Sequence, residues 1–298
     1  MKVLDYELEV GAGVAVGGLT VFPLTGVVVD GPPYLTGPEA FELGLLQVSE
    51  LGPPQVPFLA ATNLAEVPIL LVEGEMLVGG DQNRTMNVTV LCPPGKRTVV
   101  PVSCVEAGRW GMRRTMGASR RHAPGSLRAA KTANLEERSA DVHGRRSDQR
   151  KVWDEVERQS MSHGVPSQTF ALDDVQEKVE QHIEGQLEQL ETVRGQVGLV
   201  CAIGDQVVGL DLFDRTSTLQ TYLRGIVAGH ALDAPAGVQP CESISSVVRF
   251  LAQVEANGRG TGPGVGLGEK ILLRGDITGV GLSYERRLLH LAAFPVAV

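Results

Sequence analysis

The segment from Leu70 to Trp110 alternates apolar and polar residues as β-strands do, but it carries charged side chains where an ordinary sheet would place Val or Thr. Turn signals at Gly79-Gly80-Asp81 and Pro93-Pro94-Gly95 divide this segment into three strand-like pieces. Short strands joined by such turns favour an antiparallel meander. If the strands pair side by side, we expect their polar side chains to converge on one pocket.

We interpret these polar side chains as a candidate site for a small anionic ligand, because guanidinium groups and turn amides bind phosphate or carboxylate. Turn chemistry alone explains the Asp and Asn residues of the segment about equally well. The candidate catalytic residues are Glu75, Glu106 and Cys104, and the candidate ligand-binding residues are Glu73, Gln82, Asn83, Arg84 and Arg109.

Glu73 and Glu75 are two positions apart, so on a regular strand their side chains share a face, and Gly74 between them allows close approach of a ligand or another backbone. Such a pair could bind a cation or divide acid and base roles. The alternative is a structural network in which both glutamates pair with Arg84 and Arg109 and hold the strand register.

Cys104 needs a nearby base or positive charge to react as a thiolate, and a lone cysteine in a strand is more often a core residue. His290 lies in an apolar strand pattern, which is more typical of a hydrogen-bonded structural histidine than of a base. Nothing in the sequence brings these two residues together. Hydrolysis or transfer with a carboxylate as general base therefore fits better than covalent catalysis.

The histidines at 163, 182 and 230 have no partner at metal-ligand spacing, so we expect surface or helix residues and no metal site. The sequence identifies no cofactor. Its four cysteines lie far apart without C-x-x-C spacing, so we expect mostly reduced, buried residues.

Aromatic residues make up only 4% of the chain, and 36 Gly with 17 Pro indicate many turns between short strands. Strand patterns come first, helical patterns lie in the middle and strand patterns return at the end, with a hairpin turn at Gly204-Asp205. This order favours an α+β fold, rich in antiparallel sheet and with several packed helices, over a doubly wound parallel fold. The expected helices lie within residues 38–47, 127–140, 149–163, 172–194, 218–234 and 244–256.

The glycine-rich stretch 260–270 lacks the order of a Walker loop and is expected to be a flexible connection. We treat residues 1–298 as a single α+β domain in which the Arg-rich residues 111–150 form a basic insertion that could be flexible.

The formal charge of −8 hides a basic stretch, because Arg109 to Lys151 holds 12 of the 27 basic residues and only four acidic ones. Such a stretch could attract nucleic acid or phosphate, or it could complement an acidic surface of a neighbouring subunit. It lacks the interleaved aromatics usual for single-strand recognition, so nucleic acid is the less favoured partner.

The N-terminus lacks the basic start and apolar stretch of a secretory signal, and no apolar run approaches the roughly 20 residues that cross a bilayer. We therefore expect a cytoplasmic protein without a membrane partner.

Four blocks carry a family resemblance: Glu73–Arg84 (EGEMLVGGDQNR), Pro101–Trp110 (PVSCVEAGRW), Gly204–Asp214 (GDQVVGLDLFD) and Leu288–Pro295 (LLHLAAFP). They resemble the bacterial domain family named for its association with ADP-ribosylglycohydrolases and rhodanese-like phosphatases, and the likeness spans nearly the whole chain. The resemblance implies a connection with NAD and ADP-ribose metabolism and supplies no catalytic residues.

We therefore expect binding of a small anionic ligand of the ADP-ribose or NAD type, with hydrolysis as a candidate activity. The alternative is a structural or self-assembling scaffold module without catalysis. In that case the charges fix strand register and the helices between Gln149 and Arg194 build a homo-oligomer.

Overall fold

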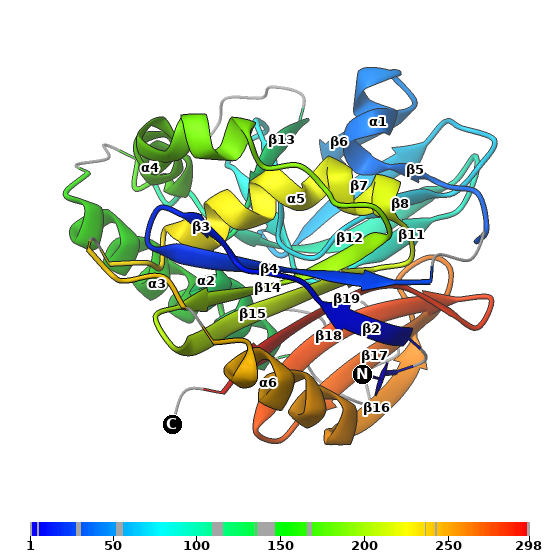
Figure 1. The fold of residues 1–298 in the computed structure, drawn as a ribbon. Helices are drawn as coiled ribbons and strands as arrows, with labels where there is room; N and C mark the ends of the chain where they lie inside the picture. Colours follow the sequence, from blue (N-terminus) through cyan, green and yellow to red (C-terminus); the bar gives the residue numbers. More distant parts are fainter. Residues whose placement is uncertain are drawn as a thin grey trace.

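The computed structural model confirms the α+β class: antiparallel sheets dominate, and helices pack against them (Figure 1). Among the residues described, no helix combines the length and apolar character needed to cross a bilayer. The structure describes residues 2–4, 6–27, 31–51, 56–108, 116–133, 135, 147–165, 169–235, 237–241 and 243–296.

The largest sheet joins the two ends of the chain, since N-terminal strands pair with strands from residues 196–213, which in turn pair with the C-terminal strands. Its order is β1-β2-β4-β14-β15-β19-β18-β17-β16, with β3 paired to β4. The strands are β1 (Lys2–Val3), β2 (Tyr6–Val10), β3 (Val14–Val16), β4 (Leu19–Gly26), β14 (Gln196–Ile203), β15 (Gln206–Phe213), β16 (Gly258–Pro263), β17 (Glu269–Arg274), β18 (Ile277–Tyr284) and β19 (Arg287–Pro295).

The predicted hairpin between β14 and β15 is confirmed, with Gly204 at φ +53° in its turn. The prediction of a flexible connection over residues 260–270 is wrong at both ends, because Gly258 to Pro263 form an edge strand and pair with β17, which begins at Glu269. Backbone pairing with β17 holds this strand in place. It lacks apolar side chains, so no apolar alternation in the sequence indicated a strand.

Two smaller sheets lie beside the large one, a six-stranded sheet of order β13-β9-β10-β12-β7-β6 and a three-stranded sheet of order β11-β8-β5. All their pairings are antiparallel except that of β5 with β8. The strands are β5 (Leu35–Thr36), β6 (Leu46–Glu50), β7 (Phe58–Asn63), β8 (Ile69–Leu71), β9 (Glu75–Val78), β10 (Arg84–Met86), β11 (Val90–Cys92), β12 (Arg97–Cys104) and β13 (Gly117–His122).

The chain changes sheet at Gly74, whose φ of +85° makes a tight turn closed by the hydrogen bond from Glu75 N to Val72 O, 3.1 Å. The single strand expected before Gly79 is therefore two strands in different sheets. The antiparallel meander is confirmed for β9, β10 and β12. It is wrong for residues 69–71 and 90–92, which pair with each other elsewhere.

Helices form in the predicted segments, but their ends differ: the helix expected within 38–47 ends at residue 42, and Leu46 begins strand β6. The helix expected within 127–140 spans 125–133, and residues 134 and 136–140 lie outside the described residues. The first begins with a capping box, in which Thr36 and Glu39 satisfy each other's backbone N–H groups. The predicted helix over 172–194 ends at residue 188, before a turn at Gly195. The helices are α1 (Gly37–Glu42), α2 (Gly125–Ala133), α3 (Gln149–His163), α4 (Leu172–Glu188), α5 (Thr216–Ala231) and α6 (Ser245–Ala256).

Two helices cover opposite faces of the large sheet, with α5 on one side and α6 on the other (Figure 1). Neighbouring residues of one strand serve different faces, as Phe22 packs in the α6 core and Val21 in the α5 core. Leu210 and Leu212 belong to the α6 core, so Asp211 between them points to the α5 side. This orientation buries a carboxylate between the large sheet and the helices.

Candidate functional site

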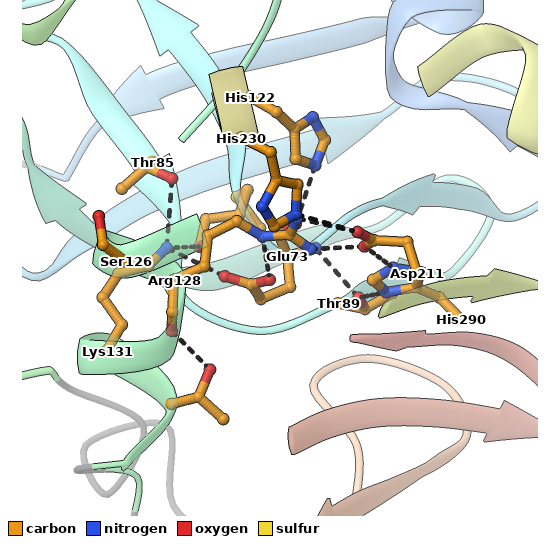
Figure 2. A network of polar contacts seen from close by, with 12 residues as sticks. Glu73, Thr85, Thr89, His122, Ser126, Arg128, Lys131, Asp211, His230 and His290 are labelled. Atoms are coloured by element: carbon orange, nitrogen blue, oxygen red, sulfur yellow. Dashed lines mark hydrogen bonds and ion pairs between the residues drawn. The ribbon is translucent and has the colours of Figure 1, made fainter. Parts of the chain in front are cut away.

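A network of charged side chains occupies the interior where α2, the large sheet and the turn at Gly74 meet (Figure 2). Arg128 and Lys131 are three residues apart on α2 and so share a helix face. Arg128 Nε donates to Glu73 Oε2 at 2.9 Å, and Lys131 Nζ lies 3.2 Å from Glu73 Oε1. Arg128 also donates to both carboxylate oxygens of Asp211, at 2.5 and 3.0 Å.

His290 of β19 extends this network into the large sheet. His290 Nε2 donates to Asp211 Oδ1 at 3.1 Å, and its Nδ1 lies 2.7 Å from Thr89 Oγ1. The Thr89 hydroxyl accepts a hydrogen bond from the backbone N–H of Glu73 at 3.0 Å, so the chain of contacts returns to Glu73. We call the set Glu73, Thr89, Arg128, Lys131, Asp211 and His290 the Arg128 network.

The charges of the Arg128 network balance, although its ionic side chains are at most 1% exposed. Burial would raise the pKa of Asp211, but Arg128 and the two neighbouring histidines, His230 and His290, hold this pKa well below its usual range. Burial lowers the pKa of Lys131 to about 8, a shift that the adjacent Glu73 opposes. Two carboxylates and two cations therefore join three parts of the fold as a structural junction.

A second polar group surrounds the end of β12, where Arg84 of β10 is paired with Cys104 in the antiparallel register. Cys104 Sγ lies 3.1 Å from both Gln82 Oε1 and the backbone oxygen of Glu106. The Glu106 carboxylate accepts the backbone N–H of Asn83 at 3.1 Å. We call Glu50, Gln82, Asn83, Arg84, Cys104 and Glu106 the Arg84 cluster.

Arg84 is buried, 1% exposed, yet its polar contacts with the described residues are long. Its Nη1 donates to the backbone oxygen of Asn83 at 3.4 Å, and its Nη2 lies 3.6 Å from Glu50 Oε1. Within the described part of the chain, three buried atoms of the cluster have no hydrogen-bond partner: Arg84 Nε, Gln82 Nε2 and Glu50 Oε2. Two of these atoms are N–H donors, which are costly to leave unpaired.

The thiol of Cys104 is held as a neutral donor. Burial raises its pKa, and the positive charge of Arg84 only partly opposes that shift. Gln149, at the start of α3, brackets the backbone of Cys104 by accepting its N–H at 2.9 Å and donating to its oxygen at 2.8 Å. This environment suits a fixed hydrogen-bond donor better than a thiolate nucleophile.

Glu75 lies in a third environment, with its Oε2 accepting from Val72 N at 3.0 Å and from the Tyr222 hydroxyl at 3.2 Å. Burial raises the pKa of Glu75 to about 7. A surface cavity of about 430 Å³ between α1, β13 and α5 is lined in part by His122 and Tyr222. Glu75 is therefore a buried, titratable carboxyl that accepts a hydrogen bond from Tyr222, one of the residues that line this cavity.

The expectation that the predicted site residues converge on one pocket is wrong. The structure divides these residues among three environments. Gly74 turns the chain, so Glu73 and Glu75 do not share a strand face. Glu73 pairs with α2 instead of Arg84, and Arg109 lies outside the described residues. The structure brings together Gln82, Asn83, Arg84, Cys104 and Glu106, all of them buried.

Sequence reasoning missed Arg128, Lys131 and Asp211. The available signals were an aspartate inside the apolar run Val207–Phe213 and two cations three apart in an Ala-rich segment. His290 contacts Asp211 and Thr89 rather than Cys104. His230 lies on α5 as a helix residue, but it is fully buried, with Nε2 4.0 Å from Asp211 Oδ2.

Across the part of the chain that the structure describes, no three His, Cys, Asp or Glu side chains are grouped so that they could hold a metal ion. The carboxylates present are instead engaged by arginine, lysine, tyrosine or backbone N–H groups.

Fold and site together define an α+β protein of antiparallel sheets joined by a buried ionic junction. The family model of the ARG and Rhodanese-Phosphatase-superfamily-associated Protein domain matches residues 7–294, so the chain belongs to that family. Searches of curated proteins and of solved structures find no match to the chain.

Proposed function

We propose that this protein binds a small anionic ligand of the ADP-ribose or NAD type at the Arg84 cluster, through Arg84 Nε and Gln82 Nε2. The observation that carries the proposal is the pair of buried N–H groups without a partner among the described residues. A buried donor without an acceptor costs about 1 to 3 kcal/mol, and a ligand oxygen would remove that cost.

Among the described residues, the two buried arginines differ in a way that favours Arg84 as the ligand residue. Arg128 is neutralised by two carboxylates through three hydrogen bonds of 2.5 to 3.0 Å. Among the described residues, Arg84 forms one ion pair, with Glu50 at 3.6 Å. Its guanidinium therefore keeps both charge and an N–H group for a further anion.

A route from solvent to the cluster is supported by Glu50, whose side chain is 18% exposed and whose Oε2 has no hydrogen-bond partner in the described residues. A ligand hydroxyl, such as a ribose carries, could donate to this oxygen. The combination of an acceptor at Glu50 with donors at Arg84 and Gln82 suits a phosphorylated sugar.

The ADP-ribose type is supported by the family's association with ADP-ribosylglycohydrolases, a connection of context rather than of chemistry. If the ligand is hydrolysed, Glu106 is the candidate general base, because its carboxylate belongs to the cluster through Asn83. Cys104 and Glu75 suit that role less well, because Cys104 is a neutral thiol and Glu75 lies elsewhere.

Ligand-induced thermal stabilisation tests the proposal. At a concentration of ADP-ribose or NAD 100 times Kd, the free energy of unfolding of the wild type should rise by about 2.7 kcal/mol. Arg84→Ala should lose this gain relative to its own unliganded Tm. Arg259→Ala is the control, because Arg259 forms an exposed pair with Glu255 and its variant should keep the gain.

The proposal is overturned if the wild type gains no stability with phosphate, ADP-ribose or NAD. Concentration-dependent assembly of the same sample would then favour the scaffold alternative.

A further inference from the structure

We infer that Cys104 is a positioning residue: its thiol orients the Gln82 amide so that only a hydrogen-bond acceptor, an oxyanion oxygen of the ligand, fits against Gln82 and Arg84. This inference rests on the proposed function of the Arg84 cluster. It assigns a role to a buried cysteine that a nucleophilic mechanism does not use.

The two ends of the Gln82 amide differ, since one is an acceptor oxygen and the other a donor nitrogen. Cys104 Sγ lies 3.1 Å from Gln82 Oε1, and a thiol carries one proton to donate. The reverse orientation would point the amide N–H at sulfur, which is a weak acceptor. The contact therefore favours Oε1 at the sulfur and leaves Nε2 for another partner.

The sulfur can impose this orientation because its own position is fixed. Gln149 holds the backbone of Cys104 through two hydrogen bonds, and the sulfur also lies 3.1 Å from the backbone oxygen of Glu106. Burial raises the pKa of this thiol, so the thiol keeps its proton although Arg84 lies nearby. The donor is thus present at neutral pH, and its one proton lies within reach of two acceptors, Gln82 Oε1 and the backbone oxygen of Glu106.

The consequence is that the Arg84 cluster holds two N–H donors, Gln82 Nε2 and Arg84 Nε, without a hydrogen-bond partner in the described part of the chain. Phosphate and carboxylate oxygens can accept from such groups, whereas an ammonium group would face donors. Cys104 would in this way set the chemical class of the ligand without touching it.

Affinities for inorganic phosphate and for ADP-ribose, measured by isothermal titration calorimetry, test the inference. Cys104→Ala removes the donor and should weaken binding about tenfold, the effect of one hydrogen bond. Cys104→Ser keeps a donor of similar size and should restore most of the affinity. Cys92→Ala is the matched control, because Cys92 is equally buried but lies on β11, and its affinity should equal that of the wild type.

A double-mutant cycle separates positioning from simple loss of packing. In a Gln82→Leu background the amide is absent, so Cys104→Ala should cause no further loss of affinity. Equal losses in both backgrounds would overturn the inference, as would wild-type affinity in Cys104→Ala. If the wild type itself binds neither probe, the proposed function fails first, which is a distinguishable result.

Discussion

Arg128 of α2 binds the carboxylate of Asp211 on β15 through two hydrogen bonds, of 2.5 and 3.0 Å, although both side chains are at most 1% exposed. The same guanidinium donates to Glu73 at 2.9 Å. One arginine therefore links a helix, the large sheet and the turn at which the chain changes sheet. Removing it would leave two carboxylates buried with only Lys131 to balance them.

Arg128→Met should lower the free energy of unfolding by about 3 to 5 kcal/mol, because it leaves the buried carboxylates of Glu73 and Asp211 without their arginine partner. Urea denaturation measures this change. Arg259→Met, which breaks an exposed pair of 2.8 Å with Glu255, is the control and should cost at most about 1 kcal/mol. A similar small cost for Arg128→Met would contradict a junction role for the network.

Glu75 should make the protein less stable as pH rises from about 4.5 to 7. Its pKa is about 7 in the fold and 4.5 without it, so in this interval the unfolded chain has released a proton that the folded chain still holds. The expected loss is about 3 kcal/mol, complete near pH 7, since each pKa unit corresponds to about 1.4 kcal/mol. Glu75→Gln should remove this slope, and an unchanged slope in urea titrations would refute the assignment.

Two helical glycines should respond to alanine in opposite directions. A Cβ at Gly225 of α5 would lie 2.3 Å from the backbone oxygen of Arg120 on β13, so Gly225→Ala should destabilise by about 1 to 3 kcal/mol. A Cβ at Gly185 of α4 would meet no described atom within 4 Å apart from the neighbouring backbone of its own helix, so Gly185→Ala should stabilise by about 0.5 to 1 kcal/mol. Thermal denaturation that shows the same sign for both would contradict the close α5–β13 packing.

All four cysteines are free and buried, and burial raises the pKa of both Cys104 and Cys92, the latter to about 12. Ellman's reagent at pH 7 should therefore label the native protein only as fast as it opens, while the denatured chain should give four thiols. Rapid modification of Cys104 in the native state, located by mass spectrometry, would instead support a thiolate nucleophile.

Local pattern was sufficient for much of the fold. The period of apolar residues predicted α3, and the Gly204 turn predicted the β14–β15 hairpin, because both depend on residues close in sequence. The change of sheet at Gly74 was not predicted. A single positive φ redirects a chain whose alternation on either side still resembles one strand.

The site was predicted less completely for the same reason. Arg84 and Cys104 were both expected in the pocket of the Leu70 to Trp110 segment, and they pair in register. The partner of Glu73 is Arg128, 55 residues later on a helix of another layer, and no local period encodes that contact. A charge inside an apolar run, as at Asp211, indicates that a buried partner exists without indicating which residue it is.

The central claim is that the unpaired donors of the Arg84 cluster bind a ligand oxyanion, and diffraction from crystals grown with ADP-ribose tests it most directly. We expect density for a phosphate oxygen about 3 Å from both Arg84 Nε and Gln82 Nε2. Ligand density located only elsewhere, for example in the cavity between α1, β13 and α5, with no oxygen at Arg84, would contradict the claim.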